Sequence, residues 1–568
     1  MKTGYPSIDK PWLKYYSEEE INTPLPECTM YELIYDRNQD NLDRTALEYY
    51  GTKITYGQMF HEIAVLASAL EDNGVKKGDI VTVCMINSPE TINLLFALNK
   101  IGAAANMVYG SSTPEELKKY IVDAKSTLVV TLDIFQDKFV EIADTTDIQQ
   151  IVVTSLSRSM AVSERPAMGP MGMEQWPLPK HPKFSTWEEF FRSDRVSTTT
   201  CHDAEAAAVI TYTGGTTGGS KGVILSNRAV VAVAVQYAER GLSRKSTWAQ
   251  LLPLFIAYGV TGSLMTPLAV GMTLIVRLPM SDSIADLCKK FKPNHILYGP
   301  AYWEAFANSD ESLDLSYLIV PFSGGDTLTP AVETKINEFF QKNGCSYPIM
   351  NGYGMSEVGA TISVSYQRAY EFGSVGIPLV KNVVAAFDVE SGKEVTYGQE
   401  GELCFCTPSM MTEYINNPEE TNNIIRRHGD GKLWVHSGDL GYITEDGFVH
   451  ISGRLKRYML CIADGVQKKV YSLDVEKVLL QHPKISKCAV VPIASKETFQ
   501  APVAFVVLKG EYQPDQKTEL ELKTFCEENL QSVYRPVRYM FVDKFPLTKV
   551  GKVDYRMLEQ EACKTDNI

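Results

Sequence analysis

Short apolar runs separated by segments of helical periodicity occupy most of the first two-thirds of the chain. Residues 79–85 form one such run, and beyond the turn at 87–89 apolar positions such as Leu94 and Leu98 recur at the spacing of one helix face. Further runs of strand length lie at 127–132, 151–154, 207–212, 272–276, 295–298, 318–322 and 347–350. Strands separated by helix-length segments predict βαβ units with largely parallel sheets.

The pattern changes after about residue 375. Residues 384–389, 402–406 and 448–451 alternate apolar and polar positions between turn residues. Such alternation predicts a smaller antiparallel, barrel-like part.

The C-terminal part combines strand-like runs at 488–491 and 503–508 with a predicted helix at 517–530, and it is long enough to be its own domain. The sequence therefore predicts an α/β fold. A large N-terminal domain, residues 1–454, would contain two α/β subdomains and a small β-barrel-like subdomain, and a small C-terminal α+β domain would occupy 455–568.

Composition agrees with a globular protein that has a sizeable core. The 568 residues are 44% hydrophobic and 22% charged, which excludes disorder as the dominant state. The formal net charge of -14 repels polyanions, so we predict no nucleic-acid partner. A local basic site for a phosphorylated small molecule stays open.

The chain begins without an apolar stretch, and its densest apolar run, near 229–235, is too short to span a bilayer. These features predict a cytoplasmic protein without a transmembrane segment. The 11 cysteines are scattered, with no C-x-x-C pair and no zinc-type spacing, so we predict reduced core cysteines. Cys404 and Cys406, the nearest pair, alternate along a predicted strand.

Residues 157–183 combine Met160, Met168, Met171 and Met173 with several prolines. This composition disfavours regular structure and predicts a surface loop. Two interpretations stay open: a tolerated insertion, or a methionine-rich lid that faces a substrate or a membrane.

The strongest chemical signal is the run 211–222, Thr-Tyr-Thr-Gly-Gly-Thr-Thr-Gly-Gly-Ser-Lys-Gly, between the predicted strand at 207–212 and a helical pattern from Ser226. Its glycines allow tight turns that expose successive N–H groups, while hydroxyls and Lys221 add donors. Such a segment forms a cradle for phosphate oxygens. It is not a Walker A loop, because its lysine precedes a glycine.

This run resembles the phosphate-binding signature of the acyl-adenylate-forming superfamily, which includes acyl- and aryl-CoA synthetases, adenylation domains of peptide synthetases, and luciferases. Gly214 and Ser220 stand where that signature has serine and proline. Further family motifs follow in the expected order: Ser323-Gly324-Gly325-Asp326, Asn351-Gly352-Tyr353-Gly354-Met355-Ser356-Glu357, Trp434-Val435-His436-Ser437-Gly438-Asp439, Gly453-Arg454 and Pro546-Leu547-Thr548-Lys549-Val550-Gly551-Lys552. The resemblance spans roughly residues 45–560.

The resemblance implies a role for each motif. Tyr353 would stack on adenine, Ser356 would touch the α-phosphate, and Glu357 would hold Mg²⁺, which prefers carboxylate oxygens. Asp439 would accept bonds from the ribose hydroxyls, with Arg454 beside the ribose or phosphate. The nucleotide-binding set implied in this way is Thr213, Gly214, Gly215, Thr216, Thr217, Gly218, Ser323, Gly324, Gly325, Asp326, Asn351, Gly352, Tyr353, Gly354, Met355, Ser356, Asp439 and Arg454.

The activity implied is ATP-dependent conversion of a carboxylic acid to an acyl-AMP, followed by transfer to the thiol of CoA. Two anions must approach in the first step, so it needs charge neutralisation by Lys552, Lys221 and the Mg²⁺ held by Glu357. The C-terminal domain would be mobile and would rotate about Lys456 between the two half-reactions.

One departure from the family pattern bears on the acid. Ile256 replaces the histidine of many CoA ligases and the aspartate with which amino-acid adenylation domains pair an α-ammonium. A buried ammonium without a partner is costly, whereas an apolar body gains by leaving water. We therefore predict an apolar fatty or aryl acid in a pocket formed by Phe255, Ile256, Tyr258 and Gly259.

A second departure bears on the acceptor. The turn that contains residues 461–470 is about four residues longer than in relatives, and in CoA-using members this turn helps to form the thiol channel. An acid–CoA ligase is favoured. A stand-alone enzyme that loads a carrier-protein phosphopantetheine is the first alternative. An adenylate-binding protein without turnover is the second, and the presence of Lys221, Glu357 and Lys552 disfavours it.

Overall fold

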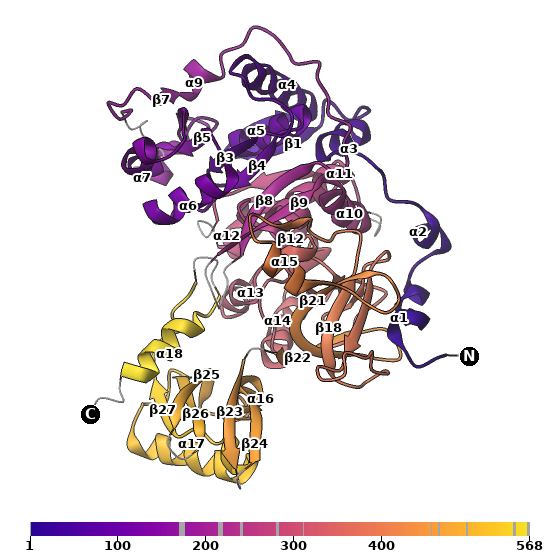
Figure 1. Ribbon diagram of the computed structural model, residues 1–568, viewed down its shortest axis with the longest axis vertical. Coiled ribbons are helices and arrows are strands. Elements are labelled where there is room, and N and C mark those ends of the chain that lie inside the picture. The colour runs from indigo at the N-terminus through magenta and orange to yellow at the C-terminus, as the bar shows by residue number, and fades with distance from the viewer. Residues whose placement is uncertain are drawn as a thin grey trace.

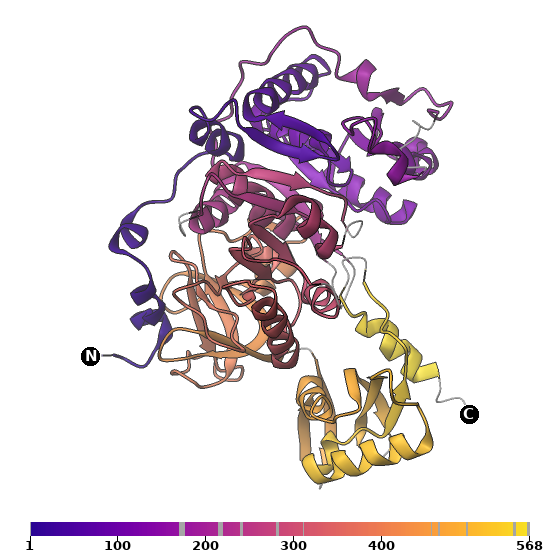
Figure 2. The ribbon, with the colours of Figure 1, turned by 180° about the vertical axis from the view of Figure 1, so that it is seen from behind.

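The computed structural model describes residues 2–169, 177–213, 220–238, 242–279, 283–309, 312–455, 457–463, 466–495, 498–548 and 552–564. Two large β-sheets with their helices, and a smaller antiparallel sheet beside them, form the main body in Figure 1. The C-terminal sheet belongs to a separate lobe below that body, and Figure 2 shows the same separation from behind. The domain boundary after residue 454 stays a prediction.

The first large sheet has the strand order β19-β9-β8-β4-β3-β5-β6-β7. The bounds are β3 Ile80–Cys84, β4 Ala104–Met107, β5 Leu128–Leu132, β6 Gln150–Thr154, β7 Phe184–Thr186, β8 Ala207–Thr213, β9 Lys221–Ser226 and β19 Glu413–Tyr414. From β8 to β7 the strands run parallel, as predicted, whereas β9 pairs antiparallel with both β8 and β19.

The second large sheet has the strand order β16-β15-β14-β13-β12-β10-β11-β1-β2. The bounds are β1 Thr45–Tyr49, β2 Thr52–Thr55, β10 Thr247–Gln250, β11 Thr273–Val276, β12 His295–Tyr298, β13 Val320–Ser323, β14 Met350–Tyr353, β15 Ser363–Val364 and β16 Ile377–Pro378. The strand predicted at 347–350 is wrong in position, because β14 begins only at Met350. Pro348 cannot donate to a ladder, which disfavours an earlier start.

The third sheet is antiparallel throughout, as the alternating pattern predicts. It contains β17 Val383–Phe387, β18 Gly401–Cys406, β20 Ile425–Arg427, β21 Leu433–Ile443 and β22 Val449–Arg454. Cys404 and Cys406 lie on β18, as predicted.

The C-terminal lobe has its own sheet and its own apolar cores. Its elements are β23 Tyr458–Ala463, β24 Val466–Tyr471, α16 Ser472–Leu479, β25 Ile485–Ser495, β26 Phe499–Leu508, α17 Gln516–Asn529, β27 Arg538–Phe541 and α18 Tyr555–Lys564. The segment 461–470, predicted as a long turn, is mostly strand: β23 and β24 form an antiparallel hairpin. The extra residues therefore lengthen two paired strands rather than a loop.

The helices of the main body begin and end at residues suited to those positions. Thr55 and Thr113 form capping boxes, and α5 ends at Gly102, which has a φ of 81°. The bounds are α1 Pro6–Asp9, α2 Glu18–Asn22, α3 Met30–Arg37, α4 Tyr56–Asp72, α5 Pro89–Ile101, α6 Pro114–Ala124, α7 Gln136–Ile142, α9 Trp187–Phe190, α10 Asn227–Ala238, α11 Thr266–Val270, α12 Ile284–Phe291, α13 Pro300–Ala307, α14 Pro330–Lys342 and α15 Pro418–Ile424.

The methionine-rich segment 157–183 is only partly a surface loop. Met160 is buried in the N-terminal core and Met168 packs against the same core. Met171 and Met173 lie outside the described residues. Met160 therefore has a packing role, which weakens the interpretation of the whole segment as a lid.

Candidate active site

The glycine-rich run connects two antiparallel strands. β8 ends at Thr213 and β9 begins at Lys221, so a strand that the sequence did not predict lies between the run and the helix. The predicted start of the helix at Ser226 is correct to within one residue, because α10 begins at Asn227. Six residues are too few for periodicity to separate a short strand from the start of a helix. Gly214, Gly215, Thr216, Thr217 and Gly218 lie outside the described residues. Ser220 Oγ donates to the Thr213 carbonyl at 2.7 Å and so joins the two ends of the run.

Lys221 lies beside Tyr414 of β19 and Glu420 of α15. Its ammonium forms an ion pair with Glu420 and lies 5.0 Å from the centre of the Tyr414 ring. The strand register explains this position, because β19 pairs with β9 and sets Tyr414 opposite Val223. The ammonium of Lys221 is therefore already paired with the Glu420 carboxylate in this structure.

Glu357 lies in the 3-10 turn Ser356–Val358, just after β14. Its buried carboxylate accepts a hydrogen bond of 2.5 Å from the Tyr414 hydroxyl. Burial raises the pKa of Glu357, and the bond from Tyr414 opposes that rise, with Lys221 acting in the same direction. Tyr414 therefore contacts both residues that the sequence predicts for phosphate and metal.

Asp439 and Arg454 are register partners on β21 and β22. Arg454 Nε lies 2.9 Å from Asp439 Oδ1, and the Tyr353 hydroxyl donates to Asp439 Oδ2 at 2.7 Å. Gly438, just before, has a φ of 70°, which glycine adopts without strain. Two of the predicted nucleotide-binding motifs thus meet at Asp439, and the Tyr353 ring is fixed by its hydroxyl.

Ser323 at the carboxyl end of β13 is the register partner of Asn351, the second residue of β14, and the two strands run parallel. This edge of a parallel sheet is a common ligand position. Two buried atoms here, Ser323 Oγ and Asn351 Oδ1, have no hydrogen-bond partner among the described residues. Leaving such atoms unpaired is costly, so a polar ligand at this edge would be stabilised by them. Asp326, at the end of the same motif, is exposed and accepts the Thr327 N–H at 2.8 Å.

The other residues of these two motifs shape the backbone. A Cβ at Gly354 would lie 2.2 Å from the Ala360 carbonyl oxygen, and Gly325 has a φ of 88°. Gly352 pairs with Val364 on β15. Met355 packs against the core of the third sheet, and Ser356 is half-buried at the start of the 3-10 turn.

Lys552 lies on a small hairpin of the C-terminal lobe. An isolated bridge pairs Leu547 with Val553, and the Thr548 N–H donates to the Lys552 carbonyl at 2.7 Å. Lys549, Val550 and Gly551 of the same motif lie outside the described residues. Lys552 itself is exposed, in contrast to Glu357 and Asp439.

The ammonium of Lys552 nevertheless lies among charges of the main body. Desolvation by the surrounding protein lowers the pKa of Lys552 and Arg454 lowers it further, whereas Asp326, Asp439 and Glu357 raise it. Lys552 of the C-terminal lobe is therefore close enough to these groups of the main body for their charges to act on its ammonium.

Two of the contacts between the lobes are polar. Lys487 of β25 forms an ion pair of 3.2 Å with Glu304 of α13, and Lys477 Nζ donates to the Ser452 carbonyl at 3.3 Å. Exposed ion pairs of this kind contribute little, so they fit a lobe that changes position. Lys456, the predicted hinge, lies outside the described residues.

The predicted acyl residues separate into two groups. Phe255 is buried against Tyr109, with ring centres 4.5 Å apart, and Ile256 packs against the same N-terminal core. Tyr258 packs against the core of the second sheet. Gly259 has a packing role, because a Cβ there would lie 1.9 Å from the Pro253 carbonyl oxygen.

Sequence reasoning missed the partners of the predicted residues. Tyr414 and Glu420 belong to no motif used above, and only the pairing of β19 with β9 reveals Tyr414. It also missed a mixed cluster in which the side-chain ligand atoms of Glu402, Cys404 and His436 lie within 4.8 Å of one another. These residues come from two paired strands, so spacing along the chain cannot show it.

In the part of the chain that the structure describes, every helix is too short or too polar to cross a membrane. All of the cysteines are free thiols, as predicted. Most are buried, but Cys563 is exposed and is therefore not a core residue.

The chain belongs to the AMP-binding enzyme family: that family's model matches residues 34–415, and the model of the AMP-binding enzyme C-terminal domain matches residues 474–552. It is 28% identical to a long-chain-fatty-acid–CoA ligase of Bacillus subtilis, over 98% of this chain and 99% of the relative. It is 27% identical to 4-coumarate–CoA ligase 2 of Petroselinum crispum, over 91% and 90%.

The fold is shared with a solved anthranilate CoA ligase, AuaEII, in complex with anthranoyl-AMP. The TM-score is 0.81 at 22% identity, with 97% of this chain and 100% of that chain covered. The predicted family is confirmed, as is the α/β fold with a large N-terminal and a small C-terminal domain.

Proposed function

We propose that this enzyme converts a carboxylic acid with an apolar body to an acyl-AMP at the expense of ATP, then transfers the acyl group to the thiol of CoA. The observation that supports it best is the position of Lys552, whose ammonium lies among Arg454, Asp439, Asp326 and Glu357. The charges of predicted nucleotide-binding residues thus act on a cation of the C-terminal lobe.

In the first half-reaction a carboxylate oxygen would attack the α-phosphorus of ATP, and the bond from that phosphorus to the leaving pyrophosphate would break. Both reactants are anions, so the residues of the chain contribute mainly by positioning and by neutralising charge. Lys221 would contact phosphate oxygens, Lys552 would lie between carboxylate and α-phosphate, and Asp439 would accept the ribose hydroxyls. Ser323 and Asn351 would pair their free polar atoms with adenine.

Magnesium fits the residues present. Glu357 supplies a buried carboxylate, the donor type that Mg²⁺ prefers, and Tyr414 holds it through one oxygen. When bound, Mg²⁺ would neutralise charge on the phosphates of ATP. Tyr414 would orient the carboxylate, and Lys221 and Arg454 would keep it ionised.

In the second half-reaction the CoA sulfur would attack the acyl carbon and the carbon–oxygen bond to AMP would break. AMP would leave with the electron pair, and the thiol proton would pass to solvent. Lys552 has no anion pair to join in this step. The polar contacts between the lobes would allow the C-terminal lobe to rotate about Lys456 and open a path for the thiol.

Ile256 packs against the N-terminal apolar core, and this supports an uncharged acyl body because Ile256 itself offers no carboxylate to an α-ammonium. The names of two relatives agree with an acid that has an apolar body, since one is a long-chain-fatty-acid–CoA ligase and the other a 4-coumarate–CoA ligase. We propose the cytoplasm as the location of this reaction.

A panel of acids tests this function by ATP-dependent AMP release with and without CoA. We expect octanoate-type or benzoate-type acids to stimulate AMP release, with CoA raising it and acyl-CoA appearing. Stimulation by free amino acids alone would contradict the substrate class. AMP release that responds to a phosphopantetheinylated carrier protein but not to CoA would assign the other acceptor.

A further inference from the structure

Glu402, Cys404 and His436 bring three different kinds of metal ligand together on one face of the third sheet. Cys404 on β18 is the register partner of His436 on β21, and the side chains of such partners lie on the same face. Glu402 lies two residues before Cys404, so its side chain points to that face as well. The carboxylate, thiol and imidazole ligand atoms all lie within 4.8 Å of one another. Strand pairing therefore assembles a mixed set of oxygen, sulfur and nitrogen ligands.

The distances within this cluster are close to those of a metal site. His436 Nδ1 lies 2.7 Å from Glu402 Oε2 and 3.4 Å from Cys404 Sγ. Tetrahedral zinc, with its ligands at roughly 2.0–2.3 Å, holds their atoms roughly 3.3–3.6 Å apart. The imidazole and the thiol already have that separation. Only the carboxylate would have to move, by roughly 0.6 Å.

Two of the three ligands are also held by groups outside the cluster, as the ligands of metal sites usually are. His428 Nε2 lies 2.9 Å from Nε2 of His436, the ring nitrogen that is not part of the cluster. The His428 ring stacks on Trp434, with ring centres 5.5 Å apart, and this fixes its position. The other oxygen of Glu402, Oε1, accepts the Gly438 N–H at 3.0 Å.

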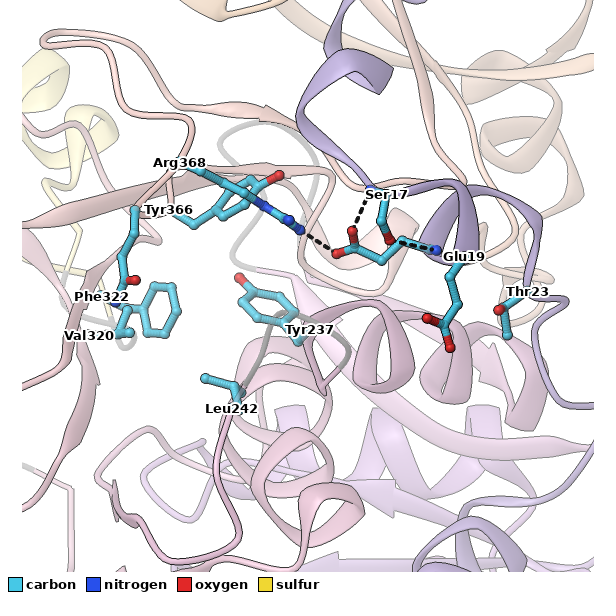
Figure 3. A pocket seen from close by; sticks show the side chains of 11 residues that line it. Ser17, Glu19, Thr23, Tyr237, Leu242, Val320, Phe322, Tyr366 and Arg368 are labelled. Atoms are coloured by element: carbon cyan, nitrogen blue, oxygen red, sulfur yellow. Dashed lines mark hydrogen bonds and ion pairs between the residues drawn. The ribbon is translucent and has the colours of Figure 1, made fainter.

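The surroundings of the thiol are apolar. Cys404 is buried in a core that also contains Phe387, Trp434 and Tyr366. Figure 3 shows Tyr366 in the wall of a cavity that α2 also lines. An apolar shell excludes water and strengthens the attraction between a cation and its ionised ligands.

We propose that Glu402, Cys404 and His436 form a zinc site, with a water molecule as the fourth ligand. A carboxylate, a thiolate and an imidazole together suit Zn²⁺, whereas Mg²⁺ prefers oxygen ligands alone. Burial and the neighbouring Glu402 raise the pKa of the Cys404 thiol, and Arg426 opposes that rise. A bound divalent cation would expel the thiol proton to solvent. The proton that joins His436 Nδ1 to Glu402 would move to Nε2, which would then donate to His428.

Such a site would be coupled to the predicted ribose contact. The register of β18 and β21 shifts beside the cluster, and residues 437–439 of β21 form a bulge that contains Gly438 and Asp439. Glu402 holds this bulge through the Gly438 N–H. If the carboxylate moves to bind zinc, that bond lengthens and Asp439 is re-aimed. We therefore expect bound zinc to weaken nucleotide binding.

Calorimetric titration with Zn²⁺ alone tests the site in a Cys563→Ala background, which lacks the exposed thiol. We expect one tightly bound equivalent, and Co²⁺ in its place should give thiolate-to-cobalt charge-transfer absorption. Cys404→Ala should lower the Zn²⁺ affinity by at least about 100-fold and abolish that absorption. Cys406→Ala is the matched control, because this cysteine lies on the same strand but outside the cluster. It should bind Zn²⁺ as tightly as the background.

Two further variants keep the test valid if Cys404→Ala does not fold. Glu402→Gln preserves the shape of the side chain and should also lower the Zn²⁺ affinity by at least about 100-fold. His428→Phe keeps a ring on Trp434 and should lower it by about tenfold, as expected for a supporting partner. Thermal unfolding shows which variants are folded. Equal Zn²⁺ binding in the background and in the folded ligand variants, or no binding in any of them, would overturn the site.

AMP binding tests the coupling, and AMP is used because the triphosphate of ATP would itself bind the metal. Saturating Zn²⁺ should lower the AMP affinity of the background by about fivefold or more and leave that of Cys404→Ala unchanged. An AMP affinity that does not respond to bound Zn²⁺ would overturn the coupling and leave the metal site standing. Neither measurement uses acid activation, so failure of the proposed function would alter neither result.

Discussion

The predicted nucleotide-binding residues of the main body and the Lys552 hairpin of the C-terminal lobe hold their charged groups in two different ways. Glu357 and Asp439 are buried, and each accepts a hydrogen bond from a tyrosine hydroxyl that belongs to a different sheet: Tyr414 of β19 for Glu357 and Tyr353 of β14 for Asp439. Lys552 is exposed, and it reaches the cleft from a lobe joined to the body by polar contacts. Packing fixes the carboxylates of Glu357 and Asp439, whereas the position of the C-terminal lobe decides where the ammonium of Lys552 lies.

This difference predicts which half-reaction each region serves. A fixed wall is present in every position of the C-terminal lobe, so its loss should affect every step that uses the nucleotide. The ammonium of Lys552 would act only when the C-terminal lobe is in the arrangement seen here. Substitutions in the two regions should therefore differ in selectivity between the steps as well as in size.

Lys552→Ala should have the largest effect, because adenylation joins two anions beside this ammonium. We expect a loss above 100-fold in single-turnover formation of acyl-AMP, about 2.7 kcal/mol in the barrier. Lys552→Arg is the matched control, since it keeps the charge. Equal losses in the two variants would argue against a charge role.

Glu357→Gln should lower the apparent affinity for Mg²⁺ by roughly 100-fold. This is the upper end of the loss seen when a residue that only supports a metal ligand is removed. A neutral amide of the same shape cannot offset a divalent cation. The measurement is the apparent Mg²⁺ affinity from steady-state AMP release. An unaltered Mg²⁺ titration would remove Glu357 from the site.

The pH dependence of the two half-reactions should differ. The pKa of Lys552 is lowered by desolvation and by Arg454, so its proton is lost at a lower pH than for an ordinary lysine. Because the charged form is required, adenylation should fall about tenfold per pH unit above that lowered pKa. Stopped-flow profiles of both steps test this, and a matching fall in thiol transfer would contradict it.

Tyr414→Phe should lower the apparent Mg²⁺ affinity by about tenfold, the lower end of the cost of an outer partner. The ring stays over Lys221, and only the bond to Glu357 is lost. Without that bond the pKa of Glu357 rises further, so the acid limb of the pH profile should move to higher pH. A limb that stays in place would show that Tyr414 is merely structural.

Glu420→Ala should have the smallest effect. It releases Lys221 from a half-exposed ion pair, and such pairs contribute little, so we expect the KM for ATP to fall about two- to fivefold. Glu419→Ala on the same helix, whose side chain is not paired with Lys221, is the matched control. A rise in KM for Glu420→Ala would mean that Glu420 helps to bind the nucleotide.

The sequence predicted most of the strands and helices, which follow from local periodicity, but few of the contacts between residues that are far apart in the chain. Period and turn residues were enough for the parallel strands such as β3 and for the antiparallel third sheet. The motif residues Ser323, Asn351 and Glu357 were predicted because their segments resemble family motifs, not from the pattern of strands and helices. β9 was missed because six residues cannot distinguish a strand from a helix start.

The partners of the site residues depend on strand register, which the sequence does not state. Tyr414 reaches Glu357 only because β19 pairs with β9, and Arg454 reaches Asp439 only because β21 pairs with β22. Such contacts are tertiary, so no local pattern encodes them.

The most direct test of the difference between the two regions is transfer from a preformed acyl-AMP to CoA by Lys552→Ala, measured in single turnover beside wild type. If Lys552 serves only adenylation, the rate of transfer in Lys552→Ala should lie within about threefold of wild type. In the same preparation the rate of acyl-AMP formation should be lower by more than 100-fold. A loss of transfer as large as the loss of adenylation would contradict the account.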